Sequence, residues 1–249
     1  MKKRVINYLL PVALLLTASV AQATVFRVYP GESIQDAIDV AAPGDTVLVE
    51  PGDYRENTGG IYGLHITTNN LRLIGKVRKG RGGVSKVRIL PADEGQTDGG
   101  TGIYAAPEGC EYNENECDGQ LEGFYLRGFS VEGFGVNGIQ TRWVDGFKFI
   151  RNESIDNLNN GIYPTLSANG LVANNTSYGS LDTAMWVAGS ENVRVVRNKL
   201  HSSVIGFEIT VSNDVDVRQN QIYNNTVGVG LFHPGGAGNP PLPVMAKAQ

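Results

Sequence analysis

A repeat of 22 to 24 residues runs across residues 121–231, and it limits the possible fold more than any other feature of the chain. An asparagine recurs with this spacing at Asn152, Asn175, Asn198 and Asn220. A small residue followed by an apolar one recurs with it, and the apolar members are Ile139, Ile162, Met185, Phe207 and Val229. Two landmarks that keep the same spacing over several units predict a solenoid, in which each unit buries its apolar face against its neighbours.

The content of one unit predicts which solenoid forms. Val193 and Val195 alternate with Arg194, and turn-forming residues follow every five or six positions, as is typical of short strands joined by tight turns. No apolar stripe of helical period runs through the region, and leucine is too sparse for leucine-rich repeats. Three strands and their turns fill one unit. We therefore predict an all-β parallel β-helix whose coils stack about 4.8 Å apart.

The two ends of the chain are expected to lie outside the repeat. Lys2, Lys3 and Arg4 precede a short apolar stretch and a small-x-small cleavage site at residues 21–23, so residues 1–23 are predicted to be a signal peptide. We expect a periplasmic or secreted protein with no membrane span in the mature chain. The β-helix domain then covers residues 24–233, and residues 234–249 form an irregular tail, which indicates truncation or a cap supplied by a partner.

A helix is predicted at residues 33–41, before the first coil. Ser33 is a suitable N-cap, and Ile34, Ala37 and Ile38 follow it at helical spacing. Such a helix would cap the N-terminal end of the stack, which would otherwise expose apolar surface and unpaired backbone groups.

Two sets of polar residues have a structural interpretation. The asparagine row fits coil corners, because Asn tolerates left-handed backbone angles and can bond from coil to coil. Cys110 and Cys117 are the only cysteines and are separated by six residues. In an exported protein they favour a local disulfide, whereas a metal site would need more thiols or histidines nearby.

Charge and histidine content argue against a nucleic-acid-binding protein and against a metal site. Without the signal-peptide cations, 18 basic residues stand against 25 acidic ones, and the negative balance excludes a general nucleic-acid binder. His65, His201 and His233 are too scattered for a metal site, and no cofactor is predicted; Ca²⁺ is compatible with the chain but not indicated. The six basic residues within residues 76–88 are interpreted as a solvated loop or, alternatively, as a contact for an anionic ligand.

The beginning of the chain resembles a known group of proteins. Gly31, Ser33, Ile34 and Gln35, followed by the motifs Pro-Gly-Asp-Thr-Val at 43–47 and Pro-Gly at 51–52, are similar to the opening of exported right-handed parallel β-helix proteins. That group contains polysaccharide lyases and epimerases and the periplasmic accessory protein of nitrous-oxide reductase maturation. The resemblance covers nearly all of residues 24–233 and implies the fold, whereas chemistry does not follow from a shared fold.

The candidate site follows from strand alternation. If the apolar landmarks face the core, Gln140, Tyr163, Trp186 and Glu208 face outward on adjacent coils. Aromatic rings beside carboxylates are typical of sugar-binding sites. We assign Asp182 and Glu208 as candidate catalytic carboxylates, and as candidate substrate-binding residues Gln140, Arg142, Tyr163, Trp186 and His201. The alternative is that a loop covers the aromatic pair as a small second core.

Two functions remain open at this point. The first is a protein that binds a polysaccharide or oligosaccharide, and we expect this ligand to be acidic. If the protein is also an enzyme, it would modify the ligand as a lyase, an epimerase or a glycosidase-like enzyme. Arg142, Lys76 and Arg78 would then provide selectivity for uronates if their loops reach this face. The second is a non-catalytic periplasmic accessory or scaffold module that binds a partner protein. The sequence lacks the Gly-His-Gly and Asp-Pro-His-Asp motifs of polygalacturonases and mannuronan epimerases, so catalysis is left open.

Overall fold

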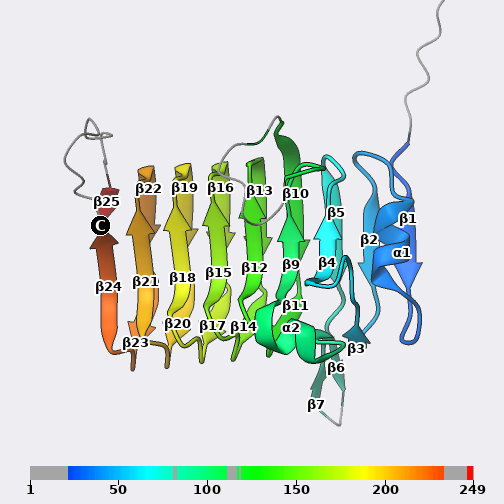
Figure 1. Ribbon diagram of the computed structural model, residues 1–249, viewed down its shortest axis with the longest axis horizontal. Coiled ribbons are helices and arrows are strands. Elements are labelled where there is room, and N and C mark those ends of the chain that lie inside the picture. Colours follow the sequence, from blue (N-terminus) through cyan, green and yellow to red (C-terminus); the bar gives the residue numbers. More distant parts are fainter. Residues whose placement is uncertain (1–21, 81–82, 111–116, 118, 233–245, 249) are drawn as a thin grey trace, which may run out of the picture.

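The computed structural model describes residues 22–80, 83–110, 117, 119–232 and 246–248. The predicted signal peptide therefore lies almost wholly outside the described residues. The chain forms a parallel β-helix in which successive coils lie side by side along one axis (Figure 1). Each regular coil contributes one strand to each of three parallel sheets, here named sheets A, B and C in the order in which the chain visits them.

The bounds of the strands repeat with the predicted period. Sheet A contains β1 (Val25–Val28), β2 (Thr46–Val49), β5 (Leu71–Gly75), β10 (Leu121–Arg127), β13 (Val144–Ile150), β16 (Ala168–Ala173), β19 (Glu191–Val196), β22 (Asn213–Arg218) and β25 (Ala246–Ala248). Sheet B contains β3 (Gly52–Arg55), β8 (Val87–Leu90), β11 (Phe129–Glu132), β14 (Glu153–Ile155), β17 (Thr176–Tyr178), β20 (Lys199–His201) and β23 (Gln221–Tyr223). Sheet C contains β4 (Tyr62–Ile66), β9 (Thr101–Ala105), β12 (Asn137–Arg142), β15 (Asn160–Thr165), β18 (Thr183–Ala188), β21 (Ile205–Thr210) and β24 (Val227–Phe232).

The predicted inward stack is confirmed on sheet C. Ile139, Ile162, Met185, Phe207 and Val229 are register partners on consecutive strands. The first four are at most 1% exposed, because coils on both sides cover them. Val229 is 53% exposed, because β24 is the last strand of its sheet.

The asparagine row forms a buried ladder at the corner where sheet A passes into sheet B. The side chain of Asn175 accepts a hydrogen bond from the backbone N–H of Asn152 at 2.8 Å and donates to the carbonyl oxygen of Phe149 at 2.9 Å. The same pattern repeats at Asn198. The structural interpretation was correct, but the expected left-handed backbone was assigned to the wrong residue. The residue before each of these asparagines has positive φ, at Arg151, Asn174, Arg197 and Gln219.

A second ladder, which the sequence interpretation missed, lies at the corner between sheets C and A. Ser167 accepts a hydrogen bond from the backbone N–H of Val144, and Ser190 and Ser212 continue the row on the next two coils. These serines are at most 3% exposed. Side-chain oxygens therefore satisfy backbone donors that the turn would otherwise leave buried without a partner.

Additional elements depart from the regular coil. Helix α1 (Ile34–Asp39) begins after the N-cap Ser33, as predicted, and buries Ile34 and Ile38 in the main core. That it closes the end of the stack remains a prediction. Helix α2 (Glu94–Gly99) lies between β8 and β9, and β6 (Arg78–Gly80) pairs with β7 (Gly83–Ser85) in a hairpin that projects from the stack (Figure 1). Among the described residues, no helix is long and apolar enough to cross a membrane.

The segment between β9 and β10 contains the disulfide. Cys110 and Cys117 are bonded, as predicted. Cys110 packs against Tyr62, Tyr104 and Ala106 in a small apolar cluster on the outer face of sheet C. The phenolic hydroxyl of Tyr104 donates to the carbonyl oxygen of Cys110 at 3.2 Å.

Of the C-terminal tail that the sequence predicted to be irregular, the structure describes residues 246–248. Ala246–Ala248 forms β25, which pairs in parallel with β22 and extends sheet A by one strand. Among the described residues, no strand extends sheets B and C in the same way, so these sheets end at β23 and β24.

Candidate functional site

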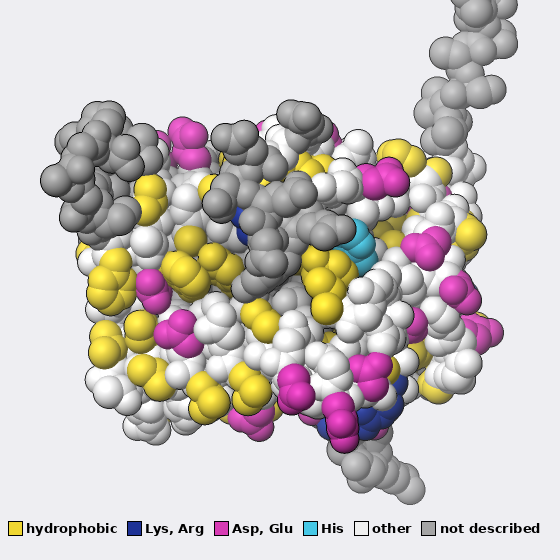
Figure 2. All heavy atoms as spheres, viewed as in Figure 1, with side chains coloured by type: hydrophobic (Ala, Val, Ile, Leu, Met, Phe, Trp, Pro, Cys, Tyr) yellow, Lys and Arg dark blue, Asp and Glu magenta, His cyan; other side chains and the backbone are white. Residues whose placement is uncertain are grey.

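The outward row on sheet C has the register that strand alternation predicted. Gln140 pairs with Tyr163, and Trp186 pairs with Glu208, which in turn pairs with Gly230. Tyr163, Trp186 and Glu208 are half-buried. Hydrophobic side chains gather over β15 and β18, and an acidic side chain lies beside them over β21 (Figure 2).

The two aromatic rings use part of their surface on each other. Tyr163 and Trp186 are stacked, with ring centroids 4.5 Å apart and planes inclined by 12°. The prediction treated both rings as open platforms, but the faces between them are not available to a ligand. Trp186 is half-buried, so a ligand can contact only the part of its ring that is exposed.

Hydroxyl groups hold the carboxylate of Glu208 in place. Thr210 Oγ1 lies 3.0 Å from Glu208 Oε1, and Thr183 Oγ1 lies 3.0 Å from Glu208 Oε2. The indole N–H of Trp186 donates to Thr210 Oγ1 at 2.8 Å, so the hydroxyl of Thr210 is free to donate to Glu208. A carboxylate offers about four acceptor sites, so Glu208 retains acceptors for a ligand.

Asp182 lies close to this carboxylate. Its Oδ1 atom is 3.5 Å from Thr183 Oγ1, the atom that also contacts Glu208. Oxygens of the two carboxylates therefore lie within about 7 Å of each other, a range in which paired carboxylates can act in glycoside chemistry. The structure thus brings together the two candidate catalytic residues named from the sequence.

Gln140 and Arg142 lie on the same face but are less accessible than predicted. Gln140 is 1% exposed, and its Oε1 atom accepts a hydrogen bond from Asn137 at 2.8 Å. Arg142 is 9% exposed. A ligand on the open part of the row would reach neither side chain without a rearrangement.

His201 does not join the group. It lies on β20 in sheet B, where its ring is stacked between those of Tyr178 and Tyr223, with centroids 4.8 Å away on each side. Sheet B faces another side of the molecule, so His201 lies apart from the outer row of sheet C.

The basic run also lies away from sheet C. Lys76 pairs with Glu50, Lys86 pairs with Glu153, and Arg88 bonds to Asp53 and Glu132. The condition under which Lys76 would select uronates, that its loop reaches the outer row of sheet C, is therefore not met. The side chain of Arg78 lies outside the described residues.

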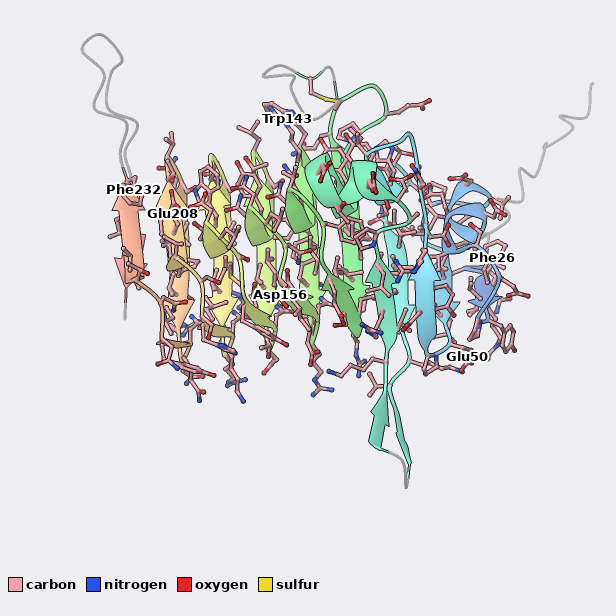
Figure 3. The ribbon with its side chains drawn as sticks, turned by 60° about the horizontal axis from the view of Figure 1, so that its bottom comes forward. Phe26, Glu50, Trp143, Asp156, Glu208 and Phe232 are labelled. Atoms are coloured by element: carbon pink, nitrogen blue, oxygen red, sulfur yellow. A yellow bond between two sulfur atoms is a disulfide. The ribbon has the colours of Figure 1, made fainter. Side chains whose placement is uncertain are left out.

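Three site residues were missed from the sequence. Thr183 and Thr210 position Glu208, and Phe232 folds back over Gly230 at the next coil. Alternation could have indicated Thr210, because it lies two residues after Glu208 and so shares its face. Glu208 and Phe232 lie together near the C-terminal end of the stack (Figure 3).

A hollow of about 560 Å³ lies elsewhere, between α2 and sheet B. Its walls include Arg55, Asp93, Glu132 and Asp156, and no aromatic ring lines it. Hydrogen bonding by Arg88 lowers the pKa of Glu132 from its ordinary value. Because sugar recognition commonly uses an aromatic face, we place the candidate site on sheet C. Among the described residues, no three His, Cys, Asp or Glu side chains gather as a metal site would require.

The geometry defines a solenoid protein with an aromatic and carboxylate-bearing outer face. The family model described as right handed beta helix region matches residues 80–239, and the chain belongs to that family. No curated protein matches the sequence at a significant level.

Solved structures share the fold. The chain is similar to a double mutant of the periplasmic alginate epimerase AlgG, with a TM-score of 0.54, 14% identity and alignment of 86% of this chain and 44% of the epimerase. It is also similar to pectate lyase Pel9A, with a TM-score of 0.50, 11% identity and alignment of 86% of this chain and 69% of the lyase. The chain thus spans less than half the length of the epimerase, and at these identities the likeness establishes the fold.

Proposed function

We propose that the protein binds a polysaccharide along the outer face of sheet C, with Trp186 and Glu208 as its central contacts. The observation that carries the proposal is the junction of an indole face and a fixed carboxylate on adjacent strands. A sugar ring presents C–H groups to an aromatic face and hydroxyl groups to acceptors, and this junction supplies both. The polysaccharide substrates named for the alginate epimerase and the pectate lyase agree with this class of ligand.

The repeat of the face suits a polymer. Equivalent positions on neighbouring coils lie about 4.8 Å apart, close to the length of one sugar residue in an extended chain. Tyr163, Trp186, Glu208 and Phe232 occupy consecutive coils, so a glycan parallel to the axis would meet a new side chain at nearly every sugar.

The charges of this face favour a neutral segment of glycan. Glu208 and Asp182 are acidic, and Arg142 is the single cation among the described residues of β15, β18, β21, β24 and the neighbouring β12. Because Arg142 is buried, it cannot offset repulsion between these carboxylates and a uronate at Glu208. The acidic ligand expected from the sequence is therefore not what this face favours.

Modification of the bound sugar is a further part of the proposal. Asp182 and Glu208 could act as a general acid and base, since both carboxylates border the same hydroxyl of Thr183. We also propose that the protein functions in the periplasm or is secreted, which the Cys110–Cys117 disulfide supports. Fractionation of cells that express the full chain would test the location.

The test compares Trp186→Ala with Tyr178→Ala. Both residues are half-buried aromatics stacked on a neighbouring ring, but Tyr178 lies on sheet B. We expect Trp186→Ala to lower affinity for a glycan selected on an array about tenfold, since aromatic stacking contributes about 1 kcal/mol or more. Tyr178→Ala should bind like the wild type. Equal loss in both variants, or no loss in either, would show that the ligand does not lie on Trp186.

Glu208→Gln separates binding from turnover. Gln keeps the shape and one acceptor oxygen, so binding should fall only a few-fold if the carboxylate merely accepts hydroxyl hydrogen bonds. If Glu208 also transfers a proton, turnover should fall at least about a hundredfold while binding persists. Product analysis on the bound glycan, with Glu191→Gln on the exposed start of β19 as the control, distinguishes these outcomes.

A further inference from the structure

The three corners of the coil differ in charge. At the corner between sheets A and B, here called the A–B corner, exposed cations recur along the stack: Arg127, Arg151, Arg197, Lys199 and Arg218. The turns at the other two corners contain no Lys or Arg among the described residues. The corner between sheets B and C includes Asp156 and Asp182. The corner between sheets C and A leads into β13 and β19, near whose starts Asp145 and Glu191 lie. The molecule is negative as a whole, yet this one edge is basic.

Most of these cations have no acidic partner. Arg127, Arg151 and Lys199 form no ion pair with a described residue, and Arg197 Nε donates to the neutral side chain of Gln219 at 2.9 Å. Arg218 pairs with Asp216 at 2.6 Å. At the N-terminal part of the same edge, by contrast, Lys76, Lys86 and Arg88 are neutralised by carboxylates. Among the described side chains of this edge, the uncompensated positive charge is therefore confined to the coils of β10 to β20.

The backbone sets these side chains in a line. Arg151, Asn174, Arg197 and Gln219 occupy the same left-handed turn position on four consecutive coils. Arg127 and Arg218 lie at equivalent strand ends four coils apart, a separation of about 19 Å at about 4.8 Å per coil. Side chains that end in nitrogen project along this lower edge of the stack (Figure 3).

We propose that the A–B corner binds a linear polysaccharide that carries carboxylates. The coil spacing is close to the length of one sugar residue, so a polymer lying along the edge can present acidic groups in register with Arg127, Arg151 and Arg197. Planar guanidinium groups bind carboxylates through two parallel hydrogen bonds. Between the arginines, the exposed amide of Asn174 can bond to hydroxyls.

A nucleic acid fits this edge less well. Phosphates in a stacked strand follow one another at intervals of about 3.4 Å along the helix axis, which is shorter than the coil spacing. The turn positions of the corner also carry no aromatic ring on which bases could stack. A membrane surface is planar, whereas these cations form a single file. The edge is separate from the outer row of sheet C, so the proposal does not depend on the site around Trp186.

The experiment measures binding of polygalacturonate and of its methyl ester by calorimetry at several salt concentrations. The double variant Arg151→Asn, Arg197→Gln should fold normally, because Asn174 and Gln219 occupy the same turn position in neighbouring coils. We expect this variant to bind polygalacturonate about tenfold more weakly, with a shallower salt dependence. The control Lys148→Gln, Arg194→Gln removes the same charge from exposed positions in the middle of sheet A and should bind normally.

Other results would contradict the proposal. No binding of polygalacturonate, equal binding of the methyl ester, or equal loss in the control variant would each exclude a site built on this corner. A single-stranded oligonucleotide that bound as tightly, with the same dependence on Arg151 and Arg197, would show that the edge takes any polyanion. A loss of polygalacturonate binding in Trp186→Ala would place the acidic polymer on sheet C instead. If glycan binding at Trp186 failed while the arginine effect held, only the function proposed for sheet C would be wrong.

Discussion

Single polar residues fix the coils of this protein to one another. Asn175 is 1% exposed, yet its amide group bonds to the coil on each side, to Asn152 and to Asn198. The period of the asparagines was enough to predict their structural role. It could not show that the residue before each one takes the left-handed conformation, because a repeat gives spacing and not backbone angles. The stacking of Tyr163 on Trp186 was likewise hidden, since alternation gives the face of a side chain but not its rotamer.

The ladder can be tested by comparing two neighbouring asparagines. Asn175→Ala leaves the backbone N–H of Asn152 and the carbonyl oxygen of Phe149 buried without these partners. We expect the free energy of unfolding to fall by about 2–3 kcal/mol, measured by urea denaturation. Asn174→Gly serves as the control, because Asn174 is exposed and Gly accepts its positive φ. A loss of the same size in both variants would mean that the turn, and not the buried ladder, carries the energy.

At the scale of elements, the sequence predicted the strands of the regular coils and the N-terminal helix well. The first coils were harder, because insertions interrupt the repeat there and α2 has only six residues, too few for a periodic pattern. Side-chain pairs between strands of different coils could not be predicted at all. Arg88 on β8, which was read as part of a solvated loop, in fact joins β3 and β11 through Asp53 and Glu132.

This link between strands should make stability depend on pH in the acid range. Hydrogen bonding by Arg88 lowers the pKa of Glu132 in the folded protein, so the contribution is present above the pKa of an unfolded Glu, about 4.3, and is lost as pH falls through the folded value. Glu132→Gln should therefore lower the free energy of unfolding by about 1 kcal/mol or less at neutral pH, since Arg88 is 41% exposed. At the acid end of the range the substitution should leave this free energy unchanged. Urea denaturation of both proteins across this pH range checks the prediction, which a pH-independent difference would contradict.

At the scale of the whole molecule, the two ends and the edges of the stack differ. Helix α1 packs at the beginning of the core, whereas β24 exposes side chains that on earlier coils would be covered. The sequence predicted an open C-terminal end, and the structure adds β25 on sheet A alone. The uneven distribution of charge was not predicted, because each cation of the A–B corner lies in a different repeat and only the coil brings them into one line.

The last coil should be the least stable part of the molecule. Leu231 is 62% exposed and Val229 53% exposed, and β23 and β24 are edge strands among the described residues. We expect hydrogen exchange to be slow through β21 and to rise from about Asn220 onward, because few buried contacts oppose opening there. The same edge should pair with a second copy at high concentration, and Leu231→Lys should suppress this association without loss of stability. Met185→Asp, by contrast, places a charge in the core and should unfold the domain. Uniform exchange protection through Phe232 in a monomer would contradict an open end, since protection of that extent requires the last coil to be covered.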